Sequence, residues 1–184
     1  MKIDQALMKL KNVLSTERYE HTLPVLQVAE KLAKQHNINI EHVQLAAVFH
    51  DYAKEFSHEQ LKQYIVEKNI DEQLLLFNDE LWHGPVAAHL IEHEFGITNK
   101  SVLNAIYYHT TGRANMDLVE LALFVADYIE PGRHFPGLCE VREKAFINLH
   151  EAALLTLKNT ITYLIKRNAT IFPHTFQAYN DLIL

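Results

Sequence analysis

The sequence has few of the residues that mark secreted, β-rich or loop-rich proteins. Its 184 residues include one cysteine, five glycines and five prolines. The single cysteine, Cys139, excludes an intramolecular disulfide framework and fits a reducing cytoplasm. Because glycine and proline are common turn residues, their scarcity predicts few turns and favours a helical protein.

Clustered positive charge and long apolar runs are also missing. The formal net charge is -6, which argues against nucleic acid as a partner because phosphate binding requires clustered lysine and arginine. No stretch of about 18 apolar residues occurs, so no segment is expected to span a membrane. The first residues, Met1 to Gln5, carry no apolar secretory core, and a cytoplasmic protein is expected.

The composition that remains is that of a folded helical domain. Hydrophobic residues make up 48% of the chain, which argues against disorder. Apolar residues recur with helical spacing, and no convincing strand alternation or internal repeat is found. Together with the length, this predicts one all-α domain over residues 1–184, a helical bundle.

Helix boundaries are marked by capping residues. Asn39, Ser57 and Asn99 each precede an expected helix, and Asp117 with Glu120 resembles a capping box. The expected helices are 2–13, one between Ser15-Thr16 and Asn37-Ile38-Asn39, one from residue 40 to the pair His50-Asp51, a polar helix after Ser57, 84–95, one from Asn99 to about His109, 118–130, two within 138–168, and 174–182.

The most informative stretch is the dipeptide His50-Asp51, which ends the apolar run 43–49. That run is too hydrophobic for a surface helix, so its helix is expected to be buried. Burying a histidine and an aspartate there is costly unless a hydrogen bond or a metal ion compensates them.

Four more residues of ligand type occupy helix ends or buried faces. His21 extends an apolar stripe, His83 lies just outside a helix that starts at Gly84-Pro85, His109 lies on the apolar face of a last helical turn, and Asp127 is set into an almost wholly apolar helix.

With His50 and Asp51, the set comprises four imidazoles and two carboxylates. These ligands suit Fe, Mn, Zn, Co or Ni. Six ligands exceed one tetrahedral zinc site and fit two metals about 3.5–4 Å apart, which can activate water and clamp phosphate oxygens. The sequence therefore predicts a metal-assisted hydrolase.

A single histidine of this kind is more often a hydrogen-bonded structural residue, and only the set of six reverses that interpretation. The rival pair, His89 and His93, lacks the glutamate that a zinc-protease helix needs after its first histidine, because Leu90 stands there. That pair is interpreted as solvated. Cys139 has no evident base beside it and is a weak candidate nucleophile.

The pattern resembles the HD-domain superfamily of metal-dependent phosphohydrolases, and within it the YqeK subfamily. The sequence departs from the pattern of this subfamily at Pro24, a position where a small residue is expected. Proline is compatible with a first turn or a kink, and the sequence leaves both open. The matching blocks are Arg18-Tyr19-Glu20-His21, His50-Asp51-Tyr52-Ala53-Lys54, His83-Gly84-Pro85, His109-Thr110-Thr111-Gly112 and Ala126-Asp127-Tyr128-Ile129-Glu130-Pro131-Gly132-Arg133.

The resemblance implies an HD domain with a core at about 18–133 and C-terminal helices in 138–184 packed on it. It also implies symmetrical bis(5′-nucleosyl)-tetraphosphatase activity, which cuts diadenosine tetraphosphate into two ADP, and a pair of metals, iron above Mn, Co, Ni or Zn. A hydroxide between the metals would attack the phosphorus.

Residue roles follow as expectations. One metal would be held by His21, His50, Asp51 and Asp127, and the other by His83 and His109 with Asp51 bridging. The expected catalytic residues are Asp51, His83 and Lys54. The expected substrate contacts are Arg18, His83, Lys54, Thr110, Thr111, Gly112 and Arg133.

Other functions stay open at this stage. The chain could hydrolyse another nucleotide, a cyclic nucleotide or an alarmone with the same chemistry, or bind a nucleotide as a regulatory module without turnover. A purely structural bundle would leave the buried polar set unexplained. The apolar C-terminal segments 171–173 and 179–184 could pack on the core or form a homodimer.

Overall fold

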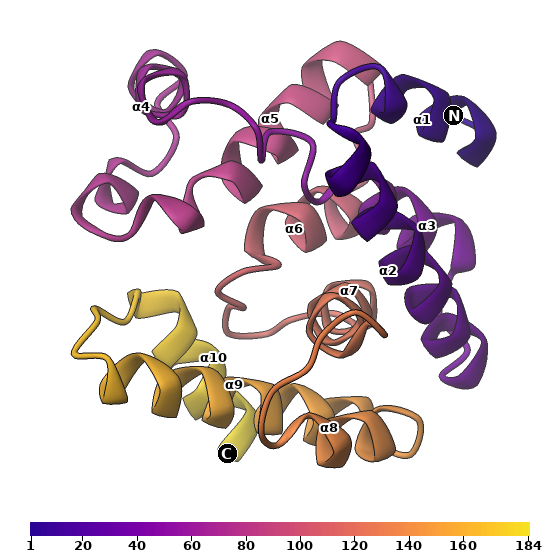
Figure 1. Ribbon diagram of the computed structural model, residues 1–184, viewed down its shortest axis with the longest axis vertical. Coiled ribbons are helices and arrows are strands. Elements are labelled where there is room, and N and C mark those ends of the chain that lie inside the picture. Colours follow the sequence, from indigo (N-terminus) through magenta and orange to yellow (C-terminus); the bar gives the residue numbers. More distant parts are fainter.

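The computed structural model describes residues 1–184 and consists of helices without a strand (Figure 1), which confirms the all-α prediction. The helices are α1 (Ile3–Lys11), α2 (Thr16–Gln35), α3 (Ile40–Phe49), α4 (His58–Glu67), the 3-10 helices η1 (Glu72–Leu76) and η2 (Asp79–Leu81), α5 (His83–Phe95), α6 (Lys100–Tyr108), α7 (Leu118–Ile129), α8 (Leu138–Ala145), α9 (Leu149–Lys166) and α10 (Pro173–Ile183).

The predicted caps are confirmed at four helix starts. Side chains of Asn39, Ser57, Asn99 and Asp117 accept hydrogen bonds from backbone N–H groups in the first turns of α3, α4, α6 and α7. These N–H groups have no partner within the helix, so each cap satisfies donors that would otherwise be exposed or unpaired. Gly96 ends α5 with a φ of 64°, the left-handed conformation that glycine adopts without strain.

Two local predictions need correction, and one open alternative is resolved. Pro24, for which the sequence left a first turn or a kink open, lies inside α2. The helix α5 begins at His83, one residue earlier than predicted, so this histidine belongs to the first turn. Glu120 does not complete a capping box with Asp117. Its carboxylate turns inward and binds Arg113, because a charged partner in a buried setting binds it more strongly than a backbone N–H.

The helix α7 lies at the centre of the bundle and is seen almost end-on in Figure 1. It packs against α2, α3, α6, α8 and α9. Contact on all sides explains why residues 121–126 are all apolar and buried. The buried residues just before Asp127 therefore fix the C-terminal half of α7, which carries Asp127, in the core.

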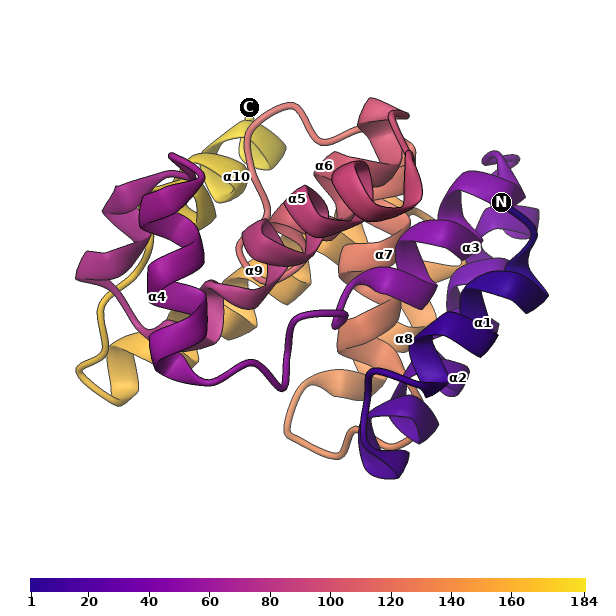
Figure 2. The ribbon, with the colours of Figure 1, turned by 90° about the horizontal axis from the view of Figure 1, so that it is seen from above.

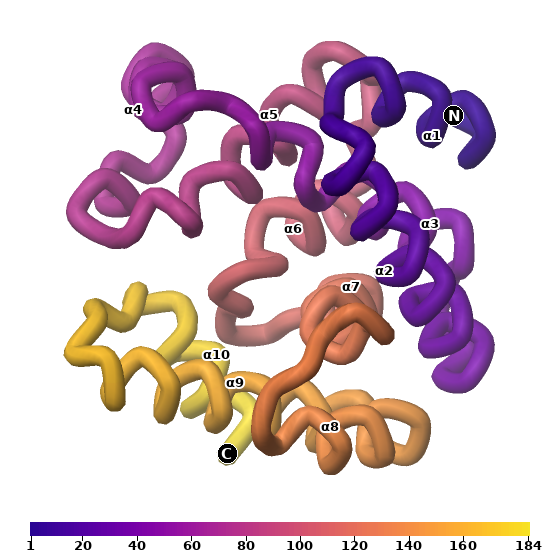
Figure 3. The backbone as a smooth tube through the Cα atoms, viewed as in Figure 1, coloured from indigo at the N-terminus to yellow at the C-terminus, as the bar shows by residue number.

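The other helices surround α7 in groups. In Figures 1 and 3, α8, α9 and α10 form a layer beneath α7, and α1, α2 and α3 lie to one side. The turned view of Figure 2 places α4 and α10 at the end of the molecule opposite α1. None of these helices combines the length and apolarity needed to cross a membrane.

Candidate metal centre and active site

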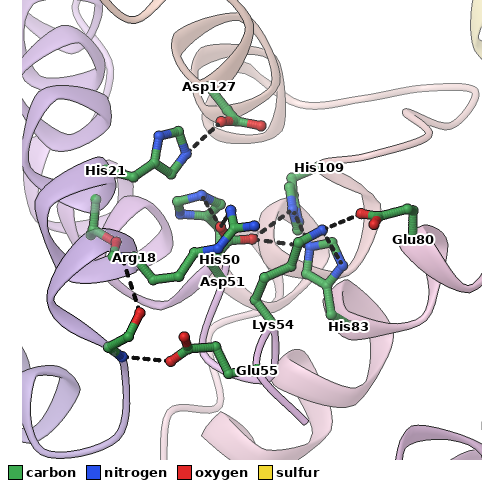
Figure 4. A network of polar contacts seen from close by, with 12 residues as sticks. Arg18, His21, His50, Asp51, Lys54, Glu55, Glu80, His83, His109 and Asp127 are labelled. Carbon is green, nitrogen blue, oxygen red and sulfur yellow. Dashed lines mark hydrogen bonds and ion pairs between the residues drawn. The ribbon is translucent and has the colours of Figure 1, made fainter. Parts of the chain in front are cut away.

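Five helices bring the predicted ligands to one place. His21 comes from α2, His50 and Asp51 from the end of α3, His83 from the start of α5, His109 from the end of α6, and Asp127 from α7. In Figure 4, His21 and Asp127 lie on one side, His83 and His109 on the other, and His50 with Asp51 between them. The structure thus brings all six together, while their role as metal ligands stays a prediction.

Two of the imidazoles are fixed by carbonyl groups of their own helices. The Nδ1 atom of His50 lies 2.8 Å from the carbonyl oxygen of Ala47, and Nδ1 of His109 lies 2.7 Å from that of Ile106. Because a carbonyl oxygen only accepts, each Nδ1 carries the proton and each Nε2 keeps a free lone pair. Carbonyl groups at helix ends have no partner within the helix. Here they fix the tautomer and orientation of both rings, so that each Nε2 is available to bind a metal.

The fit to a metal is tested by the Nε2 atom of His50. This histidine is completely buried, and its Nε2 has no hydrogen-bond partner. A buried acceptor without a partner costs about 1–3 kcal/mol. A divalent ion that accepts this lone pair would remove the penalty, so the donor set fits a metal ion.

Asp51 lies between the imidazoles. Its Oδ1 is 3.1 Å from Nε2 of His83 and 3.8 Å from Nε2 of His109, while its Oδ2 is 3.6 Å from Nε2 of His50. Carboxylate oxygens that face different imidazoles suit a bridging ligand. A metal that bound here would displace any proton on the ligand nitrogens, because only the lone pair ligates.

The Nε2 atoms of His83 and His109 are 3.0 Å apart. Two nitrogens that each lie about 2.1 Å from one ion are roughly 3 Å apart when they are neighbours in its coordination sphere. The pair therefore has the spacing of two ligands to the same ion.

His21, His50 and Asp127 form the other side of the cluster, with their ligand atoms within 4.8 Å of one another. Nε2 of His21 lies 3.2 Å from Oδ1 of Asp127. Its Nδ1 lies 3.7 Å from Oε1 of the buried Glu130. Glu130 also accepts a hydrogen bond from the backbone N–H of Gly132 at 2.6 Å, and so holds its carboxylate beside the His21 ring.

The electrostatics keep the imidazoles of His83 and His109 and the carboxylate of Asp51 in the forms that bind metal. Burial, with the neighbouring His83 and His50, lowers the pKa of His109 to about 3, and burial also lowers the pKa of His83. Burial opposes ionisation of Asp51, but His50, His83 and His109 outweigh it and hold the pKa of Asp51 well below its ordinary value. Neutral imidazoles and ionised carboxylates are the forms that bind metal.

Asp127 and His21 each favour the charged form of the other. Burial opposes ionisation of Asp127, but the hydrogen bond from His21 and the charges of His50 and Arg133 hold the pKa of Asp127 below its ordinary value. The same hydrogen bond raises the pKa of His21. Ligation there would exchange the His21 proton for a metal ion.

The cluster opens into a cavity of about 430 Å³ that carries three cationic side chains, Arg18, Lys54 and Arg133. Arg18 lies 3.7 Å from Asp51, and Arg133 lies 3.1 Å from Asp127. Each cation is paired with a carboxylate of the same cavity, since Lys54 contacts Glu80. Metal ions on the two aspartates would offset their charge and leave the lining net positive, which would attract an anionic substrate.

Lys54 is placed by contacts on both sides. Its Nζ lies 2.5 Å from Oε2 of Glu80 and 3.4 Å from Nδ1 of His83. The sequence predictions do not include Glu80, because this residue of η2 belongs to none of the motif blocks, and only the tertiary fold brings it to Lys54.

Of the three residues predicted to bind substrate after His109, Thr110 alone lines the cavity, and its buried hydroxyl oxygen has no partner. Thr111 donates its hydroxyl proton to the carbonyl oxygen of Gly112. Gly112, with a φ of 65°, packs against Ala178. The structure therefore gives Thr111 and Gly112 no direct contact with the cavity.

Several lining residues had no signal in the sequence. Tyr128 lies within the Asp127 block but has no predicted role, Phe135 follows that block, and Thr156 and Thr160 come from α9. Aromatic residues and threonines of this spacing are ordinary in amphipathic helices, so only the packing of α9 on α7 identifies them.

Comparisons with known proteins agree with this geometry. The HD domain family matches residues 18–132. The chain is 43% identical to a symmetrical bis(5′-nucleosyl)-tetraphosphatase of Bacillus subtilis, with 100% of this chain and 98% of the relative covered. It is 44% identical to a protein of the same name from Halalkalibacterium halodurans, with 98% and 96% covered.

A solved structure is also similar. It is a crystal structure from Clostridium acetobutylicum described as a predicted HD superfamily hydrolase involved in NAD metabolism. It superimposes with a TM-score of 0.92 at 36% identity, with 100% of this chain and 97% of the other covered. The match to the HD domain extends over more than half of the residues, and full-length relatives share more than a third of the sequence, so this chain belongs to the HD domain family.

Proposed function

We propose that the protein is a metal-dependent hydrolase that cleaves diadenosine tetraphosphate symmetrically into two ADP. One observation carries the proposal. Six histidine and aspartate side chains form one cluster, and four of them line a cavity that also presents Arg18, Lys54 and Arg133. The ligands suit metal ions, and the cations suit a polyphosphate chain. The names of the full-length relatives support this substrate.

Two metal ions are proposed in the cluster. His21, His50, Asp51 and Asp127 would hold one, and His83 and His109 would hold the other with Asp51 between them. Iron is our first choice because the resemblance to the YqeK subfamily implies it. The imidazole and carboxylate ligands themselves suit Mn, Co, Ni or Zn equally well. When bound, such ions activate water for attack and offset the negative charge of phosphoryl oxygens.

The protein's own residues position the substrate. Arg133 presents a guanidinium group that matches two phosphate oxygens, and Lys54 presents a point charge. Arg18 flanks the Asp51 side of the cavity. These three cations would orient the tetraphosphate so that its central linkage faces the ligand cluster.

The bond changes are those of a simple hydrolysis. The oxygen of one water molecule forms a bond to an inner phosphorus, and the bond from that phosphorus to the central bridging oxygen breaks. One ADP leaves with the bridging oxygen, and the other keeps the oxygen of water. Because ADP is a good leaving group, the site needs no strong general acid, which agrees with the neutral state of His109.

We also propose that the reaction takes place in the cytoplasm. The one cysteine, Cys139, is a free and exposed thiol. Exposed free thiols persist best in a reducing compartment.

The test is chromatography of the products after incubation with diadenosine tetraphosphate and Fe or Mn. We expect ADP alone, lost with a chelator and lost in His50→Ala. The matched control His150→Ala removes an exposed histidine of α9 and should keep full activity. AMP with ATP would contradict the cut site, and no product with any metal would contradict the proposed activity.

A further inference from the structure

A second cavity, of about 690 Å³, adjoins the first cavity, which carries Arg18, Lys54 and Arg133. Residues from the end of α7, from the loop at 131–137 and from α9 line this cavity, and these three segments lie near one another in Figure 1. The two cavities share Tyr128, Arg133, Phe135 and Thr160. The two cavities are therefore adjacent, and Arg133 belongs to the wall that they share.

The second cavity presents aromatic rings to solvent. Tyr128 and Phe135 pack edge to face with their ring centroids 4.8 Å apart. Phe135 is 37% exposed and Tyr163 is 55% exposed. Exposed rings in a concave surface offer stacking platforms for a planar base.

Polar groups lie beside these rings. Asn159 lines the cavity, and its amide carries both donors and acceptors that can pair with the edge of a base. Gly137 makes this placement feasible, because a Cβ there would come within 3.0 Å of the Asn159 amide nitrogen. The exposed Lys166 adds a positive charge at the far wall.

A substrate that is cut at its centre needs room on both sides of the cut. Of these two cavities, only the first is lined by Lys54 and by members of the ligand cluster, and its 430 Å³ is a volume suited to one drug-sized group. The second nucleoside of a dinucleoside tetraphosphate must therefore lie outside that cavity, and the phosphates that lead to it need a cation at the edge of the cavity. Arg133 is such a cation, and the second cavity follows it.

We infer that the groove formed by Tyr128, Phe135, Asn159, Tyr163 and Lys166 binds the second nucleoside of the substrate. This inference rests on the proposed function. It makes the groove a specificity element that distinguishes dinucleoside polyphosphates from mononucleotides carrying the same phosphate chain.

The test uses equilibrium binding, so that it does not depend on turnover. The probes are a non-hydrolysable methylene-bridged diadenosine tetraphosphate and the matching analogue with a single adenosine. Stacking of a base on an aromatic ring is worth a change of about 5- to 150-fold. We expect Tyr163→Ala to weaken binding of the two-adenosine probe by a factor in this range and to leave the one-adenosine probe unchanged.

Two further variants test separately whether the aromatic ring and the positive charge of the groove contribute to binding. Tyr163→Phe keeps the ring and should bind both probes as the unmodified protein does. Lys166→Glu reverses the charge of the groove and should again weaken only the two-adenosine probe. The matched control is Lys158→Ala, an exposed lysine of α9 outside both cavities, which should change neither.

Equal effects on both probes, or no effect of Tyr163→Ala and Lys166→Glu on either, would overturn the inference. Neither result would overturn the proposed hydrolysis if the unmodified protein still yields ADP. Conversely, selective weakening of the two-adenosine probe would stand even if no product formed.

Discussion

Arg113 and Glu120 form a buried ion pair that ties the segment after His109 to α7. The guanidinium group contacts both carboxylate oxygens of Glu120, at 2.8 and 2.6 Å, and the Glu120 side chain is only 1% exposed. Because the two elements carry His109 and Asp127, the pair also steadies the ligand cluster. Its removal should therefore have a measurable effect on stability.

Arg113→Met leaves the Glu120 carboxylate buried without its partner, which typically costs about 3–5 kcal/mol. This loss in the free energy of unfolding has an upper limit, because Glu120 can take up a proton on folding instead of remaining charged. Each pH unit above the ordinary pKa of 4.5 adds about 1.4 kcal/mol to that upper limit. At pH 7 the upper limit is therefore about 3.4 kcal/mol, at the lower end of the usual range.

The sign of the pH dependence follows from the same reasoning. Burial raises the pKa of Glu120 even beside Arg113, and it should rise further in Arg113→Met. A carboxyl group with a raised pKa binds more protons in the folded state than in the unfolded state. The variant should thus lose stability as the pH rises above about 4.5, until the raised pKa is passed.

The assay is urea denaturation followed by circular dichroism at pH 5, 6, 7 and 8 with chelator present. The reference is the double variant Arg113→Met/Glu120→Gln, which lacks the titrating group but keeps the same loss of packing. We expect the free energy of unfolding of Arg113→Met to fall relative to this reference by about 1.4 kcal/mol per pH unit up to the raised pKa of Glu120, and to level off above that pKa. A difference that does not change with pH would refute the reasoning.

Three further predictions concern single side chains. Glu130→Gln should weaken metal binding by about 10- to 100-fold in chelator competition, because the carboxylate lies 3.7 Å from Nδ1 of His21 and orients its ring; unchanged affinity would contradict this role. Lys54→Ala should raise KM more than it lowers kcat if Lys54 binds ground-state phosphate, and unchanged kinetics would exclude that role. Burial, with Glu94 nearby, raises the pKa of Tyr52 to about 12, so its stabilising contribution should be full below pH 10 and fall as the pH rises toward 12. The difference in ultraviolet absorbance between the unmodified protein and Tyr52→Phe should show this midpoint, and a midpoint near 10 would contradict it.

The helices were largely predictable because their boundaries are encoded locally. Asn39, Ser57, Asn99 and Asp117 cap helices from adjacent positions in the sequence, and all four do so in the structure. Glu120 shows the limit of this reasoning. Its spacing from Asp117 matches a capping box, but a tertiary contact with Arg113 determines where its carboxylate lies.

The convergence of the six histidine and aspartate residues was predictable for a different reason. Each of them is a polar residue at the end of a helix or on an apolar face, where burial demands compensation. The walls of the cavity carry no such signal. Glu80 reaches Lys54 from a 3-10 helix, and Thr160 faces the site only because α9 packs on α7.

The loop after His109 shows how finely side-chain direction matters. Thr110 and Thr111 are equivalent by composition, yet only Thr110 lines the cavity. The Thr111 hydroxyl bonds within its own turn. A one-residue difference in direction cannot be read from the sequence when no regular periodicity extends through the loop.

Hydrolysis of diadenosine tetraphosphate in water labelled with ¹⁸O, analysed by mass spectrometry, tests the central claim most directly. A metal-dependent attack by water at an inner phosphorus predicts ADP as the only product, with one labelled oxygen in one of every two ADP molecules formed. The label should be absent from the sample treated with chelator, which forms no ADP. Labelled AMP or ATP, or ADP without label, would contradict the account.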